Sequence, residues 1–214
     1  MVKTQRIKNR GFLFSWDTFG DYLLNLYLIK GANRNYIIDS GLGSACIEPI
    51  AALLEAEKPI ILINTHCHWD HVWGNAALEK ATIISHTYCY RKLEEEWDAM
   101  LKKHEGYRYG VVQKRLPDMT FNSELYFPDD MIRLFHTPGH TVDSISILDE
   151  AEGVLNCGDN VGDTLEEIIP SIYDTKAHYI DSLRNYQKLD FDTVISGHNQ
   201  VLGRDVISNI LSIL

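Results

Sequence analysis

One stretch dominates this sequence, and it reads Asn64-Thr65-His66-Cys67-His68-Trp69-Asp70-His71. It follows the apolar run Pro59-Ile60-Ile61-Leu62-Ile63, which predicts a buried strand that ends at this turn. Imidazole suits borderline divalent ions and carboxylate suits harder ones, so three histidines and an aspartate this close together indicate metal binding. One tetrahedral ion cannot use all four of these side chains from a single turn, so the stretch favours two ions. The alternative is a hydrogen-bonded polar turn or a histidine-rich surface patch.

Three other short apolar segments each run into a turn that carries one more donor. The first turn holds Pro138-Gly139-His140, the second Gly158-Asp159 and the third Gly197-His198. A sheet edge commonly builds a site from strands that end in turns of this kind. The chain therefore supplies the ligands that the first stretch lacks.

On these motifs the chain resembles the metallo-β-lactamase-fold metal-dependent hydrolases, in the glyoxalase II-like and lactonase-like branch with Asp as bridging ligand. The five ligand motifs of that family occur in order from Asp39 to His198. The resemblance implies an α+β fold, a four-layer αββα sandwich. It also implies one metal ion on His66, His68 and His140, a second on Asp70, His71 and His198, and a bridge between them at Asp159. Asp39 would support the site through a hydrogen bond to a ligand.

The expected cofactor is a pair of divalent metal ions, with zinc as the default for this donor set and iron or manganese as alternatives. Two such ions about 3.5–4 Å apart share a water, lower its pKa and direct the resulting hydroxide at a carbonyl or phosphoryl group. Asp70 and Asp159 are the candidate catalytic residues. Asp rather than Cys at position 159 resembles the thioesterase, lactonase and phosphodiesterase relatives more than the antibiotic-degrading ones.

Four more residues are weaker candidates. Trp69 and Trp73 flank two of the predicted ligands and line either a substrate pocket or the core. Asp143 either anchors a metal-bound histidine or caps a turn, and Tyr173 is a candidate for polarising a carbonyl. Cys67, by alternation, is expected to point away from the ions.

Composition narrows the class of protein. A chain of 214 residues with 45% hydrophobic composition can bury one sizeable core, so we expect a single domain over 1–214. A formal charge of −10 without a basic block disfavours a nucleic-acid partner. We find neither a signal-type apolar region nor a membrane-length one, and the four cysteines have no paired spacing. A cytoplasmic protein acting on a small molecule, of unpredicted oligomeric state, is expected.

Hydrophobic periodicity predicts alternating strands and helices. The first strands should form an antiparallel meander. The segment 105–122 has little periodicity and is either an insert leaning over the site or a plain connection, so 88–122 is a candidate lid. Strands are expected at 11–16, 22–29, 35–39, 60–64, 81–85, 124–127, 131–136, 144–148, 153–156 and 193–195, and helices at 44–57, 72–79, 88–104 and 176–189.

The function that the resemblance favours is hydrolysis of a small ester-like bond, either a thioester or a lactone. Only residues 199–214 follow the last predicted ligand, so the glutathione-contacting region of glyoxalase II is not expected. The alternatives are a phosphodiesterase acting on a small phosphodiester, a diiron redox protein and a non-catalytic metal-binding module. The redox relatives usually carry Glu where His68 stands, which disfavours that alternative.

Overall fold

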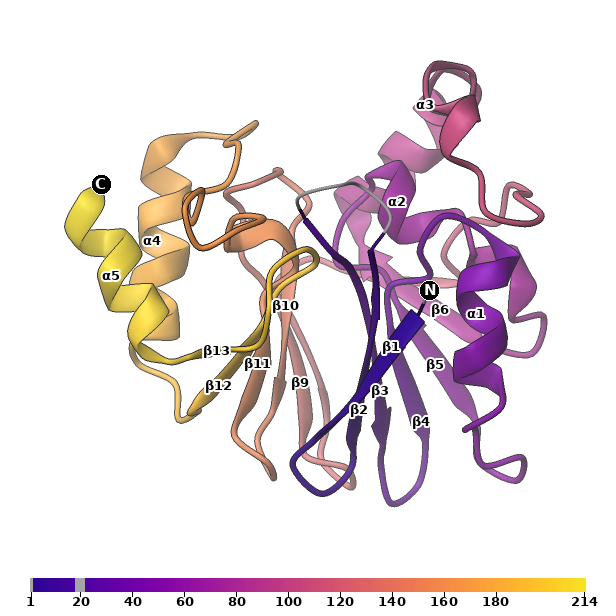
Figure 1. The fold of residues 1–214 in the computed structure, drawn as a ribbon, viewed down its shortest axis with the longest axis horizontal. Coiled ribbons are helices and arrows are strands. Elements are labelled where there is room, and N and C mark those ends of the chain that lie inside the picture. Colours follow the sequence, from indigo (N-terminus) through magenta and orange to yellow (C-terminus); the bar gives the residue numbers. More distant parts are fainter. Residues whose placement is uncertain (1, 18–21) are drawn as a thin grey trace.

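Two β-sheets pack face to face, and helices cover the outer face of each, in the computed structural model of the protein (Figure 1). The structure describes residues 2–17 and 22–214. Helices α1, α2 and α3 lie outside the first sheet, and α4 and α5 lie outside the second. This arrangement confirms the predicted four-layer αββα sandwich of the α+β class.

The first sheet has the strand order β1-β2-β3-β4-β5-β6-β7. Its first four strands are antiparallel, as expected for a meander, and β4 to β7 run parallel to one another. The strands are β1 Val2–Ile7, β2 Gly11–Trp16, β3 Leu24–Lys30, β4 Asn35–Ile38, β5 Ile60–Ile63, β6 Thr82–His86 and β7 Met119–Phe121.

The second sheet has the order β13-β12-β11-β10-β9-β8. Only β11 and β12 run parallel, and the other neighbours are antiparallel. The strands are β8 Glu124–Phe127, β9 Ile132–His136, β10 Ile145–Asp149, β11 Val154–Asn156, β12 Thr193–Ile195 and β13 Leu202–Gly203.

The helices differ in length and in what they cover. None among the described residues is both long and apolar enough to cross a membrane. The α-helices are α1 Ser44–Ala51, α2 Trp69–Val72, α3 Thr87–Lys103, α4 Lys176–Tyr186 and α5 Asp205–Ile213, and the 3₁₀ turns are η1 Asn75–Ala77, η2 Glu105–Tyr107 and η3 Gly158–Asn160.

Three apolar layers hold the sandwich together. The central layer lies between the sheets and joins side chains such as Tyr27 and Ile38 from the first sheet to Leu134 and Ile147 from the second. A second layer packs the first sheet against α1, and a third packs the other sheet against α4 and α5. Burial of apolar surface in these layers is the main force that stabilises the fold.

Two predicted helices are much shorter in the structure, and an asparagine side chain makes polar contacts just beyond each of them. The helix expected over 72–79 stops at Val72, because the buried side chain of Asn75 is held by Asn64 and by the Ser40 hydroxyl. The helix expected over 44–57 stops at Ala51. Beyond it the Asn35 side-chain amide donates to the Glu55 carbonyl, which holds that segment away from a helical path.

The strands also decide where a site can form. Parallel strands end at a common edge, and β4, β5, β11 and β12 all belong to parallel pairs. The segments that follow these four strands contain Asp39, the 66–71 stretch, Asp159 and His198, and His140 follows the antiparallel β9, so the fold gathers the motifs at one edge of the sandwich.

Candidate metal centre

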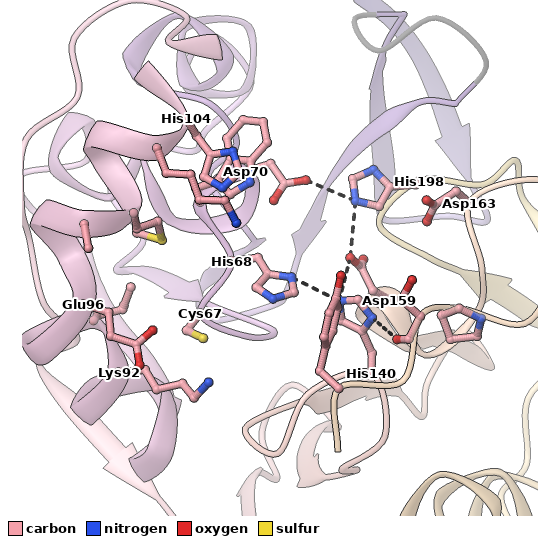
Figure 2. Close-up of a pocket in the computed structure, with 18 of the residues that line it drawn as sticks. Cys67, His68, Asp70, Lys92, Glu96, His104, His140, Asp159, Asp163 and His198 are labelled. Atoms are coloured by element: carbon pink, nitrogen blue, oxygen red, sulfur yellow. Dashed lines mark hydrogen bonds and ion pairs between the residues drawn. The ribbon is translucent and has the colours of Figure 1, made fainter. Parts of the chain in front are cut away.

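The structure brings all seven predicted metal ligands together at this edge (Figure 2). They form two groups, within each of which the donor atoms lie within 4.8 Å of one another. The first group comprises His66 and His68 after β5, His140 in the β9–β10 connection and Asp159 in η3. The second comprises Asp70 and His71 in α2 and His198 after β12.

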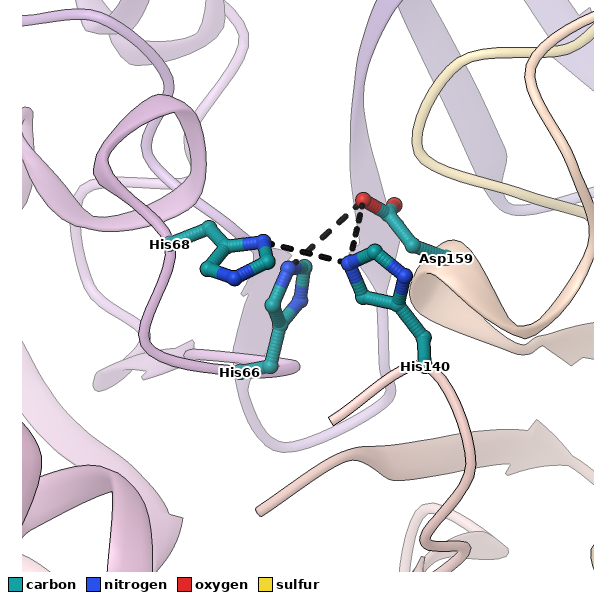
Figure 3. Close-up of side chains that lie close together, drawn as sticks. All are labelled: His66, His68, His140 and Asp159. Carbon is teal, nitrogen blue, oxygen red and sulfur yellow. Dashed lines mark hydrogen bonds and ion pairs between the residues drawn. The ribbon is translucent and has the colours of Figure 1, made fainter. Parts of the chain in front are cut away.

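In the first group the ring nitrogens converge on a carboxylate (Figure 3). His140 Nε2 lies 3.1 Å from His68 Nδ1. Asp159 Oδ2 lies 3.6 Å from His66 Nε2 and 3.6 Å from His140 Nε2. Three imidazoles and one carboxylate oxygen thus surround a small common space.

The same carboxylate oxygen faces the second group. Asp159 Oδ2 lies 3.3 Å from Nε2 of His71 and 3.3 Å from Nε2 of His198. Asp70 Oδ2 lies 3.3 Å from His198 Nε2 and 3.8 Å from His71 Nε2. Asp159 Oδ2 therefore lies between the two groups, where a bridging ligand would have to lie.

The other ring nitrogen of several histidines is held from behind. His71 Nδ1 lies 2.8 Å from Asp39 Oδ2, and His140 Nδ1 lies 2.8 Å from the Ser171 carbonyl. His198 Nδ1 lies 2.7 Å from the Leu23 carbonyl. An acceptor at Nδ1 keeps the proton there, which leaves the Nε2 lone pair directed into the centre.

Asp39 lies directly after β4 in the left-handed region, with φ of 63°. Its Oδ1 accepts a hydrogen bond from the Thr65 backbone N–H, and its Oδ2 accepts one from the Thr65 hydroxyl as well as contacting His71. One carboxylate thereby orients both a histidine and the turn that carries His66.

The buried polar atoms of the centre indicate a cation site. Among the described residues, three of its buried polar atoms have no hydrogen-bond partner: His66 Nε2, His71 Nε2 and Asp159 Oδ1. Buried polar atoms without partners are costly, and a bound cation would satisfy such acceptors. At Gly197 a Cβ would overlap Asp159 Oδ1, so the backbone is shaped closely around this carboxylate. The donor set fits two divalent ions.

Charges in the centre are strongly coupled. Burial acts to raise the pKa of Asp159, but the surrounding histidines, His71 first, hold it well below its usual value. Burial acts to lower the pKa values of His71 and His198, but the carboxylates, Asp159 first, raise both well above the usual value. Protons and cations would therefore compete for these ring nitrogens.

A cavity of about 600 Å³ opens in front of the two groups. Its wall opposite the donors is one face of α3, and Trp69 and Tyr173 both line the cavity. Trp73 does not line it, because its side chain is fully buried against Leu93 and Trp97. The segment beyond α3 instead packs on α1, where the carbonyls of Tyr109 and Val111 accept backbone N–H groups.

Asp143 lies close to Cys67 rather than to a histidine of the centre. It is fully buried, its Oδ1 lies 3.6 Å from Cys67 Sγ, and its Oδ2 has no hydrogen-bond partner among the described residues. No hydrogen bond or ion pair among the described residues joins it to a histidine of the centre, and His140 is held by the Ser171 carbonyl instead. Cys67 is directed toward Asp143 and away from the donors, as alternation predicted.

Sequence reasoning missed two kinds of contributor. Ser171 and Leu23 act through backbone carbonyls, which no side-chain pattern reveals. Lys92, Glu96 and Met100 line the cavity from α3. Their spacing of four residues places them on one helix face and was the available signal.

Comparison with known proteins gives consistent results. A family model described as the metallo-beta-lactamase superfamily matches residues 20–198. The acyl-coenzyme A thioesterase MBLAC2 of Gallus gallus is 24% identical over 88% of this chain and 76% of its own length. A probable metallo-hydrolase of Methanocaldococcus jannaschii is 27% identical over 87% of this chain and 93% of its own.

Solved structures show the same fold. A metallo-beta-lactamase from Pontibacter korlensis has a TM-score of 0.74 at 16% identity and covers 100% of this chain and 98% of its own. The archaeal protein ST1585 from Sulfolobus tokodaii has a TM-score of 0.69 at 23% identity, covering 89% of this chain and 79% of its own. At these identities the likeness extends to the fold alone.

Proposed function

The chain belongs to the metallo-beta-lactamase superfamily and is a metal-dependent hydrolase, and from this premise we propose that it cleaves a small acyl thioester, with a lactone as the second choice. The observation that carries the proposal is the position of Asp159 Oδ2, at 3.3–3.6 Å from the ring nitrogens of four histidines in two groups.

Each group would hold one ion. The first ion would be bound by His66, His68 and His140, and the second by Asp70, His71 and His198. Asp159 would bind both ions. Zinc is the default metal for a set of five histidines and two aspartates. When bound, two such ions lower the pKa of a shared water and polarise the carbonyl that it attacks.

The chain's own residues set the conditions for that attack. Asp39, Ser171 and the Leu23 carbonyl fix the ring orientations, so the donors need little rearrangement during the reaction. Trp69 and Tyr173 border the cavity and would confine the acyl group near the donors. The buried position of Asp159 excludes water from one side of the centre.

Two observations favour a thioester. The relatives named acyl-coenzyme A thioesterase align over 88% of this chain. A cavity of about 600 Å³ accommodates a small acyl group and its scissile bond, while the rest of a large leaving group would extend outside. The solved metallo-beta-lactamases share only the fold, and Asp at position 159 separates this chain from those that carry Cys there.

The test is a parallel screen of metal-loaded protein against an acyl thioester, a homoserine-type lactone, a small phosphodiester, an aryl sulfate and a cephalosporin. We expect the thioester to have the highest kcat/KM and the lactone to follow. Fast phosphodiester turnover without acyl hydrolysis would overturn the proposal. No turnover of any of the five substrates would indicate a metal-binding module without catalysis.

A further inference from the structure

The face of α3 that lines the cavity carries charged side chains. Lys92, Glu96 and Lys103 all border the cavity from this helix, together with the apolar Leu93 and Met100. Figure 2 shows Lys92 and Glu96 on the wall across from His68 and His140. A substrate that reaches the donors must therefore pass along this face.

Lys92 differs from the other cations of α3. Its side chain is half-buried, whereas Arg91, Lys102 and Lys103 are exposed. Figure 2 shows its ammonium group reaching into the cavity near Cys67. The ammonium group thus lies at the cavity that leads to the donors, and not on the outer face of α3.

Among the described residues, no hydrogen bond or ion pair holds this ammonium group, although Glu96 follows it by one helical turn and lines the same wall. The carboxylates on the opposite wall, Asp70 and Asp159, face the histidines. A positive charge that borders the cavity and has no partner among the described residues is suited to an anionic group brought by the ligand.

We propose that Lys92 binds a carboxylate or phosphate group of the substrate and so selects substrates that carry a negative charge close to the scissile carbonyl. The assignment of the reaction rests on the proposed function, whereas the anion site does not. Lys92 and the donors line the same cavity of about 600 Å³, so the anionic group and the scissile bond of one small substrate would both lie in it.

Two matched substrate pairs test this selectivity and show which side of the bond carries the charge. The first pair is the succinyl and butyryl thioesters of N-acetylcysteamine, which differ in the acyl part. The second is the butyryl thioesters of 3-mercaptopropionate and of propanethiol, which differ in the leaving group. We expect the charged member of at least one pair to have a kcat/KM about 10- to 100-fold higher, the size of one charge-assisted hydrogen bond.

Substitutions at Lys92 then test whether this residue causes the preference for the charged substrate. Lys92→Gln should bring the ratio within the pair close to one, Lys92→Glu should invert it, and Lys92→Arg should retain it. The matched control is Lys102→Gln, on the exposed side of the same helix, which should keep the wild-type ratio. A wild-type ratio near one for both pairs, or a preference that survives in Lys92→Gln, would refute the proposal.

A binding measurement separates this proposal from the proposed reaction. Calorimetry with succinate and metal-loaded protein should show about tenfold weaker binding to Lys92→Gln than to the wild type or to Lys102→Gln. If no thioester is hydrolysed, the proposed reaction fails while this experiment still decides the anion site. Equal succinate binding to all three proteins would rule the site out.

Discussion

At the scale of single residues, the centre depends on partners that hold each donor in place. The Asp39 carboxylate illustrates this, because it contacts both His71 and the Thr65 turn. Such supporting contacts typically change metal affinity by about 10- to 100-fold when they are removed. Asp39→Ala should therefore weaken binding of one ion by about that factor. Competition with a chromophoric chelator measures it, with the exposed Asp129→Ala as control.

Asp159 should be the least replaceable donor. Asp159→Ala removes the oxygen that faces four histidines, so turnover should fall by orders of magnitude, by about 1,000-fold or more. The fold should survive, because no apolar core volume is lost. Activity assays on whichever substrate the screen identifies, with circular dichroism as the folding control, test this. Near wild-type turnover in a folded variant would exclude a bridging role.

Metal binding should strengthen as the pH rises. The raised pKa values of His71 and His198 mean that their protons stabilise the metal-free fold below about pH 6.5, and this stabilisation is lost as the pH rises through the raised values. Asp159 stays ionised throughout, because its pKa is held low. Ions must displace the two protons, so affinity should rise by up to about 100-fold per pH unit in this range.

Calorimetry in buffers of different ionisation enthalpy checks this prediction, since it counts the protons released as zinc binds. Release should be largest below the raised pKa values and should decline above them. Affinity that is independent of pH, with no proton release, would show that these histidines are already neutral in the metal-free protein.

The residues that the sequence singled out by side-chain chemistry at fixed spacing lie together in the structure. The donors at positions 66–71 could be read because a turn after a buried strand has few ways to direct them. The supports from Ser171 and Leu23 could not be read, because every residue has a carbonyl. The alternatives for Asp143 and Trp73 stayed open, because sequence proximity to a ligand does not say which way a side chain points.

At the scale of elements, polar contacts join the two sheets at the end opposite the centre. The turn before β9 carries Asp130, whose buried carboxylate accepts hydrogen bonds from the Asn33 backbone, the Tyr36 hydroxyl and Arg34 of the β3–β4 region. Close by, Arg10 pairs with the buried Asp149. These contacts hold the two sheets together at this end, whereas the metal-ligand candidates lie at the opposite edge.

Asp130→Asn should destabilise the protein by about 2–3 kcal/mol. It removes the negative charge that Arg34 faces, and the amide of Asn accepts fewer of the hydrogen bonds that the carboxylate accepts. The exposed Asp129→Asn should change the free energy of unfolding by less than about 0.5 kcal/mol. Urea denaturation measures both. Metal content should stay at the wild-type value, since the turn lies far from the centre, and a parallel loss of metal would contradict this separation.

Elements were predictable where burial alternates or recurs at helical spacing. The helix α4 begins at Lys176 as predicted, whereas β1 was missed because its residues Lys3 to Arg6 are all exposed and show no alternation. The helix α5 was also missed. The shortened α1 and α2 depend on the contacts of Asn35 and Asn75 with distant segments, which local periodicity does not contain.

At the scale of the whole molecule, the donors come from both halves of the sandwich. His66 to His71 follow strands of the first sheet, whereas His140, Asp159 and His198 follow strands of the second. Two ions in the centre would therefore cross-link the sheets at the edge opposite the Asp130 contacts. The central apolar layer joins the same two sheets independently of metal.

Chelation should therefore lower the melting temperature without dividing the transition. At a free ion concentration of about 1,000 times Kd, one ion adds about 4 kcal/mol, which for a chain of this size corresponds to about 8–16 °C. The shared apolar layer should keep unfolding cooperative, as the expected single domain requires. Scanning calorimetry with and without chelator tests both points, with a magnesium-saturated chelator as control. Two separate transitions after chelation would mean that the ions, and not the apolar layer, couple the sheets.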